Sequence, residues 1–116
     1  MRQILLAAAA VSLLAAGQAS AHARLLKSSP AKGATVAAPK ALTLTFSEEI
    51  VAAKSSVAVT AAGRPAATGP ISLDKTKKVV TVPVTGALAP GAYKVDWKMT
   101  TEDTHTMTGT FGFKVK

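Results

Sequence analysis

Short runs of alternating apolar and polar residues constrain this chain more than any other feature. The clearest run is Ala41–Ser47, in which Leu42, Leu44 and Phe46 share one face. Since side chains alternate between the two faces of a β-strand, such a run predicts a strand with one buried face. Similar runs recur between Gly, Pro and Ser/Thr turns, and no segment has a sustained helical repeat. The pattern predicts an all-β, Greek-key β-sandwich or barrel, immunoglobulin-like or cupredoxin-like, of about seven strands.

The same alternation places the other expected strands at 24–28, 55–60, 71–73, 79–84, 93–97 and from 107 onward. Ala61–Gly69 is rich in small and turn-forming residues and is expected to be a loop. Pro83 indicates a strand end or an edge, because proline cannot donate to a sheet. Leu88–Tyr93 resembles a tyrosine corner, in which the hydroxyl of Tyr93 bonds to upstream backbone.

Residues 1–21 have the features of a cleaved secretory signal peptide. Arg2 precedes an apolar run from Ile4 to Ala16, which is shorter than the roughly 20 residues that span a bilayer. The small residues Ala19–Ala21 then form a cleavage pattern. We expect residues 22–116 to be a single mature, secreted domain. The alternative is an uncleaved membrane anchor.

Cysteine content and charge exclude several classes of protein. The chain has no cysteine, so neither a disulfide nor a thiolate metal site is available in the oxidising compartment that secretion implies. Its formal net charge of +8 comes from scattered bases, with only three Phe, one Trp and one Tyr. Nucleic-acid binding requires a concentrated basic patch with interleaved aromatics. We therefore expect no nucleic-acid partner, although weak attraction to anionic surfaces is compatible with this charge.

The two histidines carry the functional prediction. Signal-peptide cleavage would make His22 the N-terminal residue, which offers a metal its α-amine and its imidazole. His105 follows Asp103 at an alternate position, and alternate residues of a strand point to the same face. Three nitrogens and one oxygen suit a tetragonal Cu(II) site. The sequence therefore predicts a copper site made of His22, Asp103 and His105, at which zinc is a weaker competitor. The alternative is that His105 is an ordinary surface residue and His22 a frayed terminus.

Six segments lie in order along the expected mature chain: His22, Ser28–Gly33, Leu44–Glu48, Pro90–Trp97, Asp103–His105 and Thr108–Val115. Together they resemble the CopC family of periplasmic copper-binding resistance proteins. The resemblance implies a Greek-key β fold and Cu(II) bound by His22, Asp103 and His105. It also implies that Glu48 lies near the site, where a carboxylate can orient an imidazole ligand. The alternative for Glu48 is a surface acid paired with a lysine.

Methionine content separates this chain from some members of that family, which hold Cu(I) in a methionine-rich loop. The corresponding stretch, Thr60–Ser72, has neither Met nor His. Met99 is expected in the core, and Met107 is expected to pack in the core or at its rim, with lining of the metal site as the alternative. The chain is therefore expected to bind Cu(II) only.

The resemblance implies a non-enzymatic Cu(II) carrier or buffer for copper resistance and homeostasis. We expect a monomer that delivers copper to an inner-membrane CopD-like importer. One alternative is an enzyme, since a terminal histidine also resembles the histidine brace of copper-dependent polysaccharide monooxygenases. Such enzymes use an aromatic substrate face, whereas Tyr93 and Trp97 are needed inside this domain. The other alternative is a metal-free, immunoglobulin-like interaction module.

Overall fold

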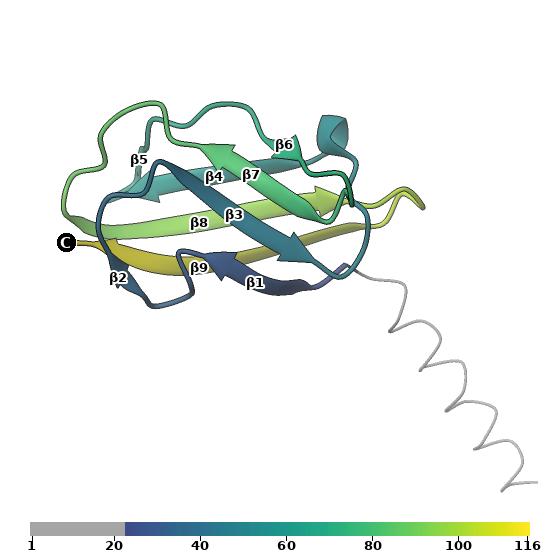
Figure 1. Cartoon of the computed structure of the whole chain (residues 1–116), viewed down its shortest axis with the longest axis horizontal. Helices are drawn as coiled ribbons and strands as arrows, with labels where there is room; N and C mark the ends of the chain where they lie inside the picture. The colour runs from purple at the N-terminus through teal and green to yellow at the C-terminus, as the bar shows by residue number, and fades with distance from the viewer. Residues whose placement is uncertain (1–22) are drawn as a thin grey trace, which may run out of the picture.

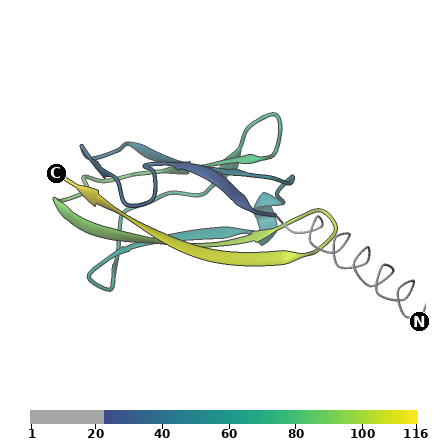
Figure 2. The same ribbon diagram turned by 90° about the horizontal axis from the view of Figure 1, so that it is seen from below.

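Two β-sheets form the layers of a sandwich in the computed structural model, which describes residues 23–116 (Figure 1). The four-stranded sheet has the order β1-β3-β7-β6, and the five-stranded sheet has the order β2-β9-β8-β4-β5. Figure 2 shows the two layers edge-on. The predicted all-β sandwich is confirmed, and the two sheets remain separate rather than closing into one barrel.

The four-stranded sheet is built around β3, the strand with the clearest alternation. β3 pairs antiparallel with β1 on one side and with β7 on the other. A β-bulge interrupts β1 between Leu25 and Lys27. Pro83 ends β7, as predicted. The strands of this sheet are β1 (Leu25–Ser29), β3 (Ala41–Phe46), β6 (Ser72–Leu73) and β7 (Val79–Pro83).

The five-stranded sheet is built on a long hairpin of β8 and β9. These strands pair without interruption from Gly91 opposite Val115 to Thr100 opposite Thr106, so the hairpin runs the length of the sandwich. β4 pairs antiparallel with β8, and β2 pairs parallel with β9. The bounds are β2 (Thr35–Val36), β4 (Ser56–Ala61), β5 (Arg64–Pro65), β8 (Gly91–Thr100) and β9 (Thr106–Val115), and a 3₁₀ turn, η1, covers Ala52–Lys54.

The core lies between the sheets and follows the predicted alternation. In β3, Leu42, Leu44 and Phe46 are fully buried, while the residues between them are partly exposed. The ring of Phe46 meets the ring of Trp97 from β8 edge-on, with centroids 5.1 Å apart. Burial of each large apolar side chain contributes about 1.5–3 kcal/mol to the free energy of unfolding. The domain has no disulfides, so its stability depends on this burial.

The predicted tyrosine corner is confirmed. The Tyr93 hydroxyl donates to the carbonyl oxygen of Ala89 at 2.7 Å, and the Tyr93 ring stacks on Phe113 with centroids 5.4 Å apart. This contact fixes the connection between β7 and β8, where the chain crosses from one sheet to the other.

The strand count and one predicted loop are corrected by the structure. The described part of the chain has nine strands rather than about seven, because three strands have only two residues each. Ala61–Gly69 is not a loop throughout: β5 pairs back on β4, and Thr68 bridges to Val84. Two-residue strands carry no alternation that a sequence pattern can reveal. Within residues 23–116, no helix has the length and apolar character needed to cross a membrane.

Candidate metal centre

Three connections gather at the end of the sandwich from which β1 starts (Figure 1). They are the β3–β4 connection (47–55), the β6–β7 turn (74–78) and the β8–β9 turn (101–105). The N–H of Ile50 donates to the carbonyl of Lys77, and that of Val51 donates to the carbonyl of Thr100, both at 2.8 Å. Ile50 also forms a β-bridge with Thr101. Backbone bonds therefore hold the three connections together as one platform.

The β8–β9 turn carries the predicted Asp103-Thr104-His105 triplet. The N–H of Thr101 donates to the carbonyl of His105, and the N–H of Thr104 donates to the carbonyl of Thr101, both at 2.9 Å. Thr104 has a left-handed backbone with φ of 69°. The triplet thus lies in the connection between β8 and β9. The closure of this turn, and not alternation, brings Asp103 beside His105.

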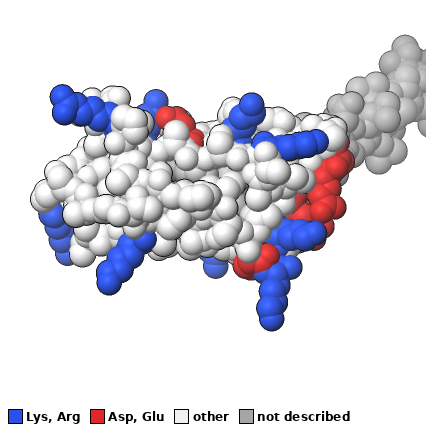
Figure 3. All heavy atoms as spheres, turned by 90° about the horizontal axis from the view of Figure 1, so that it is seen from above, with Lys and Arg blue, Asp and Glu red and all other residues white. Residues whose placement is uncertain are grey.

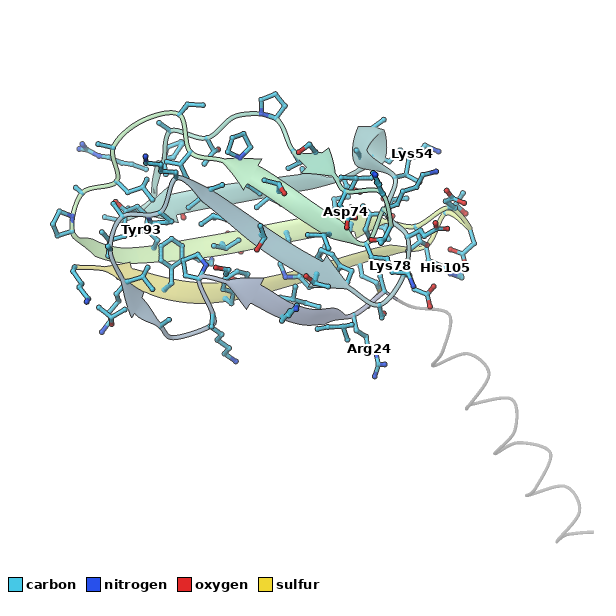
Figure 4. All side chains as sticks on the ribbon, in the orientation of Figure 1. Arg24, Lys54, Asp74, Lys78, Tyr93 and His105 are labelled. Atoms are coloured by element: carbon cyan, nitrogen blue, oxygen red, sulfur yellow. The ribbon has the colours of Figure 1, made fainter. Side chains whose placement is uncertain are left out.

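Asp103 and His105 form a close pair at the tip of this end. Asp103 Oδ2 lies 3.1 Å from His105 Nδ1, and the two side chains are 57% and 47% exposed. The other carboxylate oxygen, Oδ1, accepts a hydrogen bond from the Thr101 hydroxyl. That hydrogen bond lowers the pKa of Asp103 below its ordinary value, and the neighbouring imidazole lowers the pKa further. Figure 4 shows His105 at the tip, far from Tyr93 at the other end.

The separation of these two atoms suits a shared cation. Two ligand atoms that each lie about 2.0 Å from a metal, at right angles to one another, are about 2.8 Å apart. The observed 3.1 Å differs from this separation by a few tenths of an ångström. The two atoms are therefore close enough together for both to contact one cation.

The third predicted ligand, His22, lies outside the described residues. Its neighbour Ala23 is buried, with 1% exposure. The N–H of Arg24 donates to Ser47 Oγ and the N–H of Ser47 donates to the carbonyl of Arg24, both at 2.9 Å. The chain that directly follows His22 is thus fixed to the β3–β4 connection, which belongs to the same platform as the Asp103–His105 pair.

Glu48 follows Ser47 on this connection and is partly buried. It forms no ion pair with a lysine in the part of the chain that the structure describes. Across residues 23–116, no three His, Cys, Asp or Glu side chains group closely enough to hold a metal. Among the described residues, the Asp103–His105 pair is therefore only part of the predicted set of ligands.

Acidic residues concentrate at this end (Figure 3). Of the six Asp and Glu residues, only Asp96 lies away from the three connections; the others are Glu48, Glu49, Asp74, Glu102 and Asp103. Glu102 pairs with Lys77 at 3.6 Å, which links the β8–β9 turn to the β6–β7 turn. The carboxylates favour approach of a cation, while nearby lysines limit their net charge.

The structure shows one contact of the Asp103 side chain that the sequence did not predict, and it shows where the two methionines pack. Thr101 contacts Asp103, but a threonine in a threonine-rich stretch gives no sequence signal; only its burial, at 4% exposure, distinguishes it. Met99 is fully buried and Met107 packs against the core, which confirms the packing prediction for both.

Comparison with known proteins identifies the family of this chain. The model of the CopC domain matches residues 25–116. Copper resistance protein C of Pseudomonas syringae pv. tomato is 34% identical over 114 residues, which cover 92% of this chain and 90% of that protein. Protein YobA of Escherichia coli K12 is 37% identical over 99 residues, which cover 83% of this chain and 80% of that protein.

Solved structures show the same relationship. The crystal structure of PcoC, a methionine-rich copper resistance protein from Escherichia coli, superposes with a TM-score of 0.76 and 32% identity, covering 82% of this chain and 99% of PcoC. CopC from Methylosinus trichosporium OB3b superposes with a TM-score of 0.75 and 26% identity, covering 82% of this chain and 94% of that one. With the family model matched over almost all of the described sandwich, the chain belongs to the CopC family of copper resistance proteins.

Proposed function

We propose that this protein is a periplasmic Cu(II) carrier or buffer that holds one copper ion with His22, Asp103 and His105. The observation that supports it most directly is the Asp103–His105 pair, whose Oδ2 and Nδ1 atoms lie 3.1 Å apart on a fixed turn. His22 would add an amine and an imidazole once the signal peptide is removed. Glu48, on the same platform, would orient an imidazole from outside the ligand set.

The donor types favour Cu(II) over Cu(I). Nitrogen and carboxylate donors suit Cu(II), whereas Cu(I) prefers thioether or thiolate sulfur. The chain has no cysteine, and the stretch Thr60–Ser72, which begins at the end of β4 and includes β5, lacks methionine. Met99 and Met107 are engaged in packing with the core.

Burial of the aromatic residues favours a binding protein over a polysaccharide-oxidising enzyme. All five aromatic side chains lie in the core, and none is on the surface around the Asp103–His105 pair. A carbohydrate would therefore find no ring on which to stack. The family relationship supports a role in copper resistance, and it makes a CopD-like importer in the inner membrane the proposed recipient.

The proposal is tested on the mature chain that begins at His22, by Cu(II) titration against a chelator and by EPR. We expect one tightly bound Cu(II) with nitrogen couplings in the spectrum. Because each ligand contributes several kcal/mol to a site of four donors, His22→Ala or His105→Ala should weaken binding by about 100-fold or more. Acetylation of the α-amine of His22 should weaken it similarly, since it converts the amine into an amide.

Asp96→Asn is the matched control for Asp103→Asn. Asp96 is a carboxylate of β8 that pairs with Lys94 at 3.7 Å, away from the platform. We expect Asp96→Asn to keep full affinity and Asp103→Asn to lose it. Undiminished affinity in the His22 variant and in the acetylated chain would refute the proposed site.

A further inference from the structure

We propose that Thr101 is a positioning residue for copper binding: its hydroxyl holds the Asp103 carboxylate so that Oδ2 faces the site beside His105. This inference rests on the proposed copper site and adds to it a residue that contacts a ligand but not the metal. Three features of the structure support it: the fixed position of Thr101, the different partners of the two Asp103 carboxylate oxygens, and the exposure of the Asp103 side chain.

Burial and backbone hydrogen bonds hold Thr101 in one position. It is buried, with 4% exposure, and it bridges to Ile50 of the β3–β4 connection. Its N–H donates to His105 and its carbonyl accepts from Thr104, so the backbone of Thr101 closes the turn. The preceding residue, Thr100, is tied through its own N–H to Ser55 Oγ at 2.9 Å. The backbone that carries the Thr101 hydroxyl is therefore fixed in position.

The two oxygens of Asp103 have separate roles. Oδ1 accepts the hydrogen bond from the Thr101 hydroxyl, while Oδ2 lies 3.1 Å from His105 Nδ1. Holding one oxygen fixes the plane of the carboxylate and therefore the direction in which the other oxygen points. A metal ligand held in this way by an outer partner binds more tightly than one that must be ordered on binding.

Because the Asp103 side chain is exposed, its carboxylate needs the hydrogen bond from Thr101 to keep one orientation. The Asp103 side chain is 57% exposed, so packing does little to select its rotamer. Without the hydroxyl, the carboxylate would sample several orientations and would lose that freedom when the metal binds. The expected consequence is weaker copper binding with little change in the fold.

Thr100 provides a matched control. It is adjacent, of the same type and also buried, with 6% exposure. Its hydroxyl donates to the carbonyl of Lys54 at 2.9 Å and lies 3.0 Å from Thr106 Oγ1, so its partners do not include Asp103. Thr100→Val therefore removes a buried hydroxyl from the same strand end without touching the ligand.

The experiment measures Cu(II) affinity by chelator competition on the mature chain that begins at His22. Thr101→Val should weaken binding about tenfold, while Thr101→Ser, which keeps the hydroxyl, should retain wild-type affinity within a factor of about three. Thr100→Val should bind copper like the wild type. Circular dichroism and thermal melts establish that each variant is folded, and Thr101→Ala repeats the test if the valine does not fit.

A double-mutant cycle then tests whether the hydroxyl acts through Asp103. In the Asp103→Ala background, Thr101→Val should cause no further loss. An equal loss in both backgrounds, or a Thr101→Val variant with wild-type affinity and EPR spectrum, would overturn the role of Thr101 while leaving the copper site intact. If Asp103→Ala and His105→Ala both bind copper like the wild type, the copper site itself is refuted, and the role of Thr101 is refuted with it.

Discussion

Asp103 remains ionised over a wider range of pH than an ordinary aspartate. The Thr101 hydroxyl and, to a lesser degree, the His105 imidazole lower its pKa, so the carboxylate keeps its charge as the pH falls toward the usual aspartate range. The carboxylate is therefore ready to bind a cation throughout the pH range in which imidazole and amine groups exchange their protons, roughly 6 to 8 for free groups.

The pH dependence of copper binding should consequently come from the nitrogen ligands. Each nitrogen must lose its proton to bind Cu(II), so affinity should fall as the pH is lowered from about 8 to about 6. Chelator competition at several pH values measures the slope. Asp103→Asn should weaken binding at every pH in this range, and equal affinity of the variant and the wild type would show that the carboxylate does not contribute.

The β8–β9 hairpin depends on a glycine that faces the core. Gly109 lies opposite Trp97 in the register, and a Cβ at Gly109 would come within 2.8 Å of the indole Nε1 and closer still to two ring carbons. The indole thus occupies the space that a side chain at position 109 would need. This arrangement places Trp97 against Phe46 of the opposite sheet.

Gly109→Ala should therefore destabilise the fold, although alanine is ordinarily the better residue in a strand. Overpacking of this kind costs about 1–3 kcal/mol of unfolding free energy. Urea denaturation measures the loss, and the emission of Trp97, the only tryptophan, should shift to the red as the ring is displaced. Thr110→Ala, on the outer face of the same strand, is the control and should change stability by less than about 1 kcal/mol. Equal stability of Gly109→Ala and the wild type would contradict the packing described for Trp97.

Alternation predicted the long strands well because a buried face repeats every second residue. It identified Leu42, Leu44 and Phe46 in β3 and the inward side chains of β8 and β9, and it missed the pairing of β5, which has two residues. At the candidate metal centre, the chemistry of the residue types predicted Asp103 and His105. The role of Thr101 depends on a bridge to Ile50, which is far away in sequence, and no local pattern reveals it.

The proposed copper site joins the two sheets of the sandwich. Asp103 and His105 belong to the turn of the five-stranded sheet, whereas His22 directly precedes the segment that leads into β1 of the four-stranded sheet. A bound metal would therefore connect two layers that are otherwise held by packing and a few crossing connections. In a domain without cysteine, this connection takes the place that a disulfide often has in secreted proteins.

Copper should accordingly stabilise the mature fold. At a free Cu(II) concentration of about 100 times Kd, the gain is about 2.7 kcal/mol. For a domain of this size, that gain corresponds to a rise in Tm of roughly 10 to 20 °C. Calorimetry with and without copper measures it. The chain acetylated at the α-amine of His22 should show a much smaller rise; an equal rise would mean that copper stabilises the fold through another site.

The length of the β8–β9 hairpin separates the Asp103–His105 pair from the C-terminus, which lies at the opposite end of the sandwich (Figure 1). A purification handle or a fluorescent label attached after Lys116 will therefore stay clear of the metal. At the other terminus, residues left before His22 by a cloning vector would block the amine of the proposed site, so protein for copper-binding measurements should carry its tag at the C-terminus.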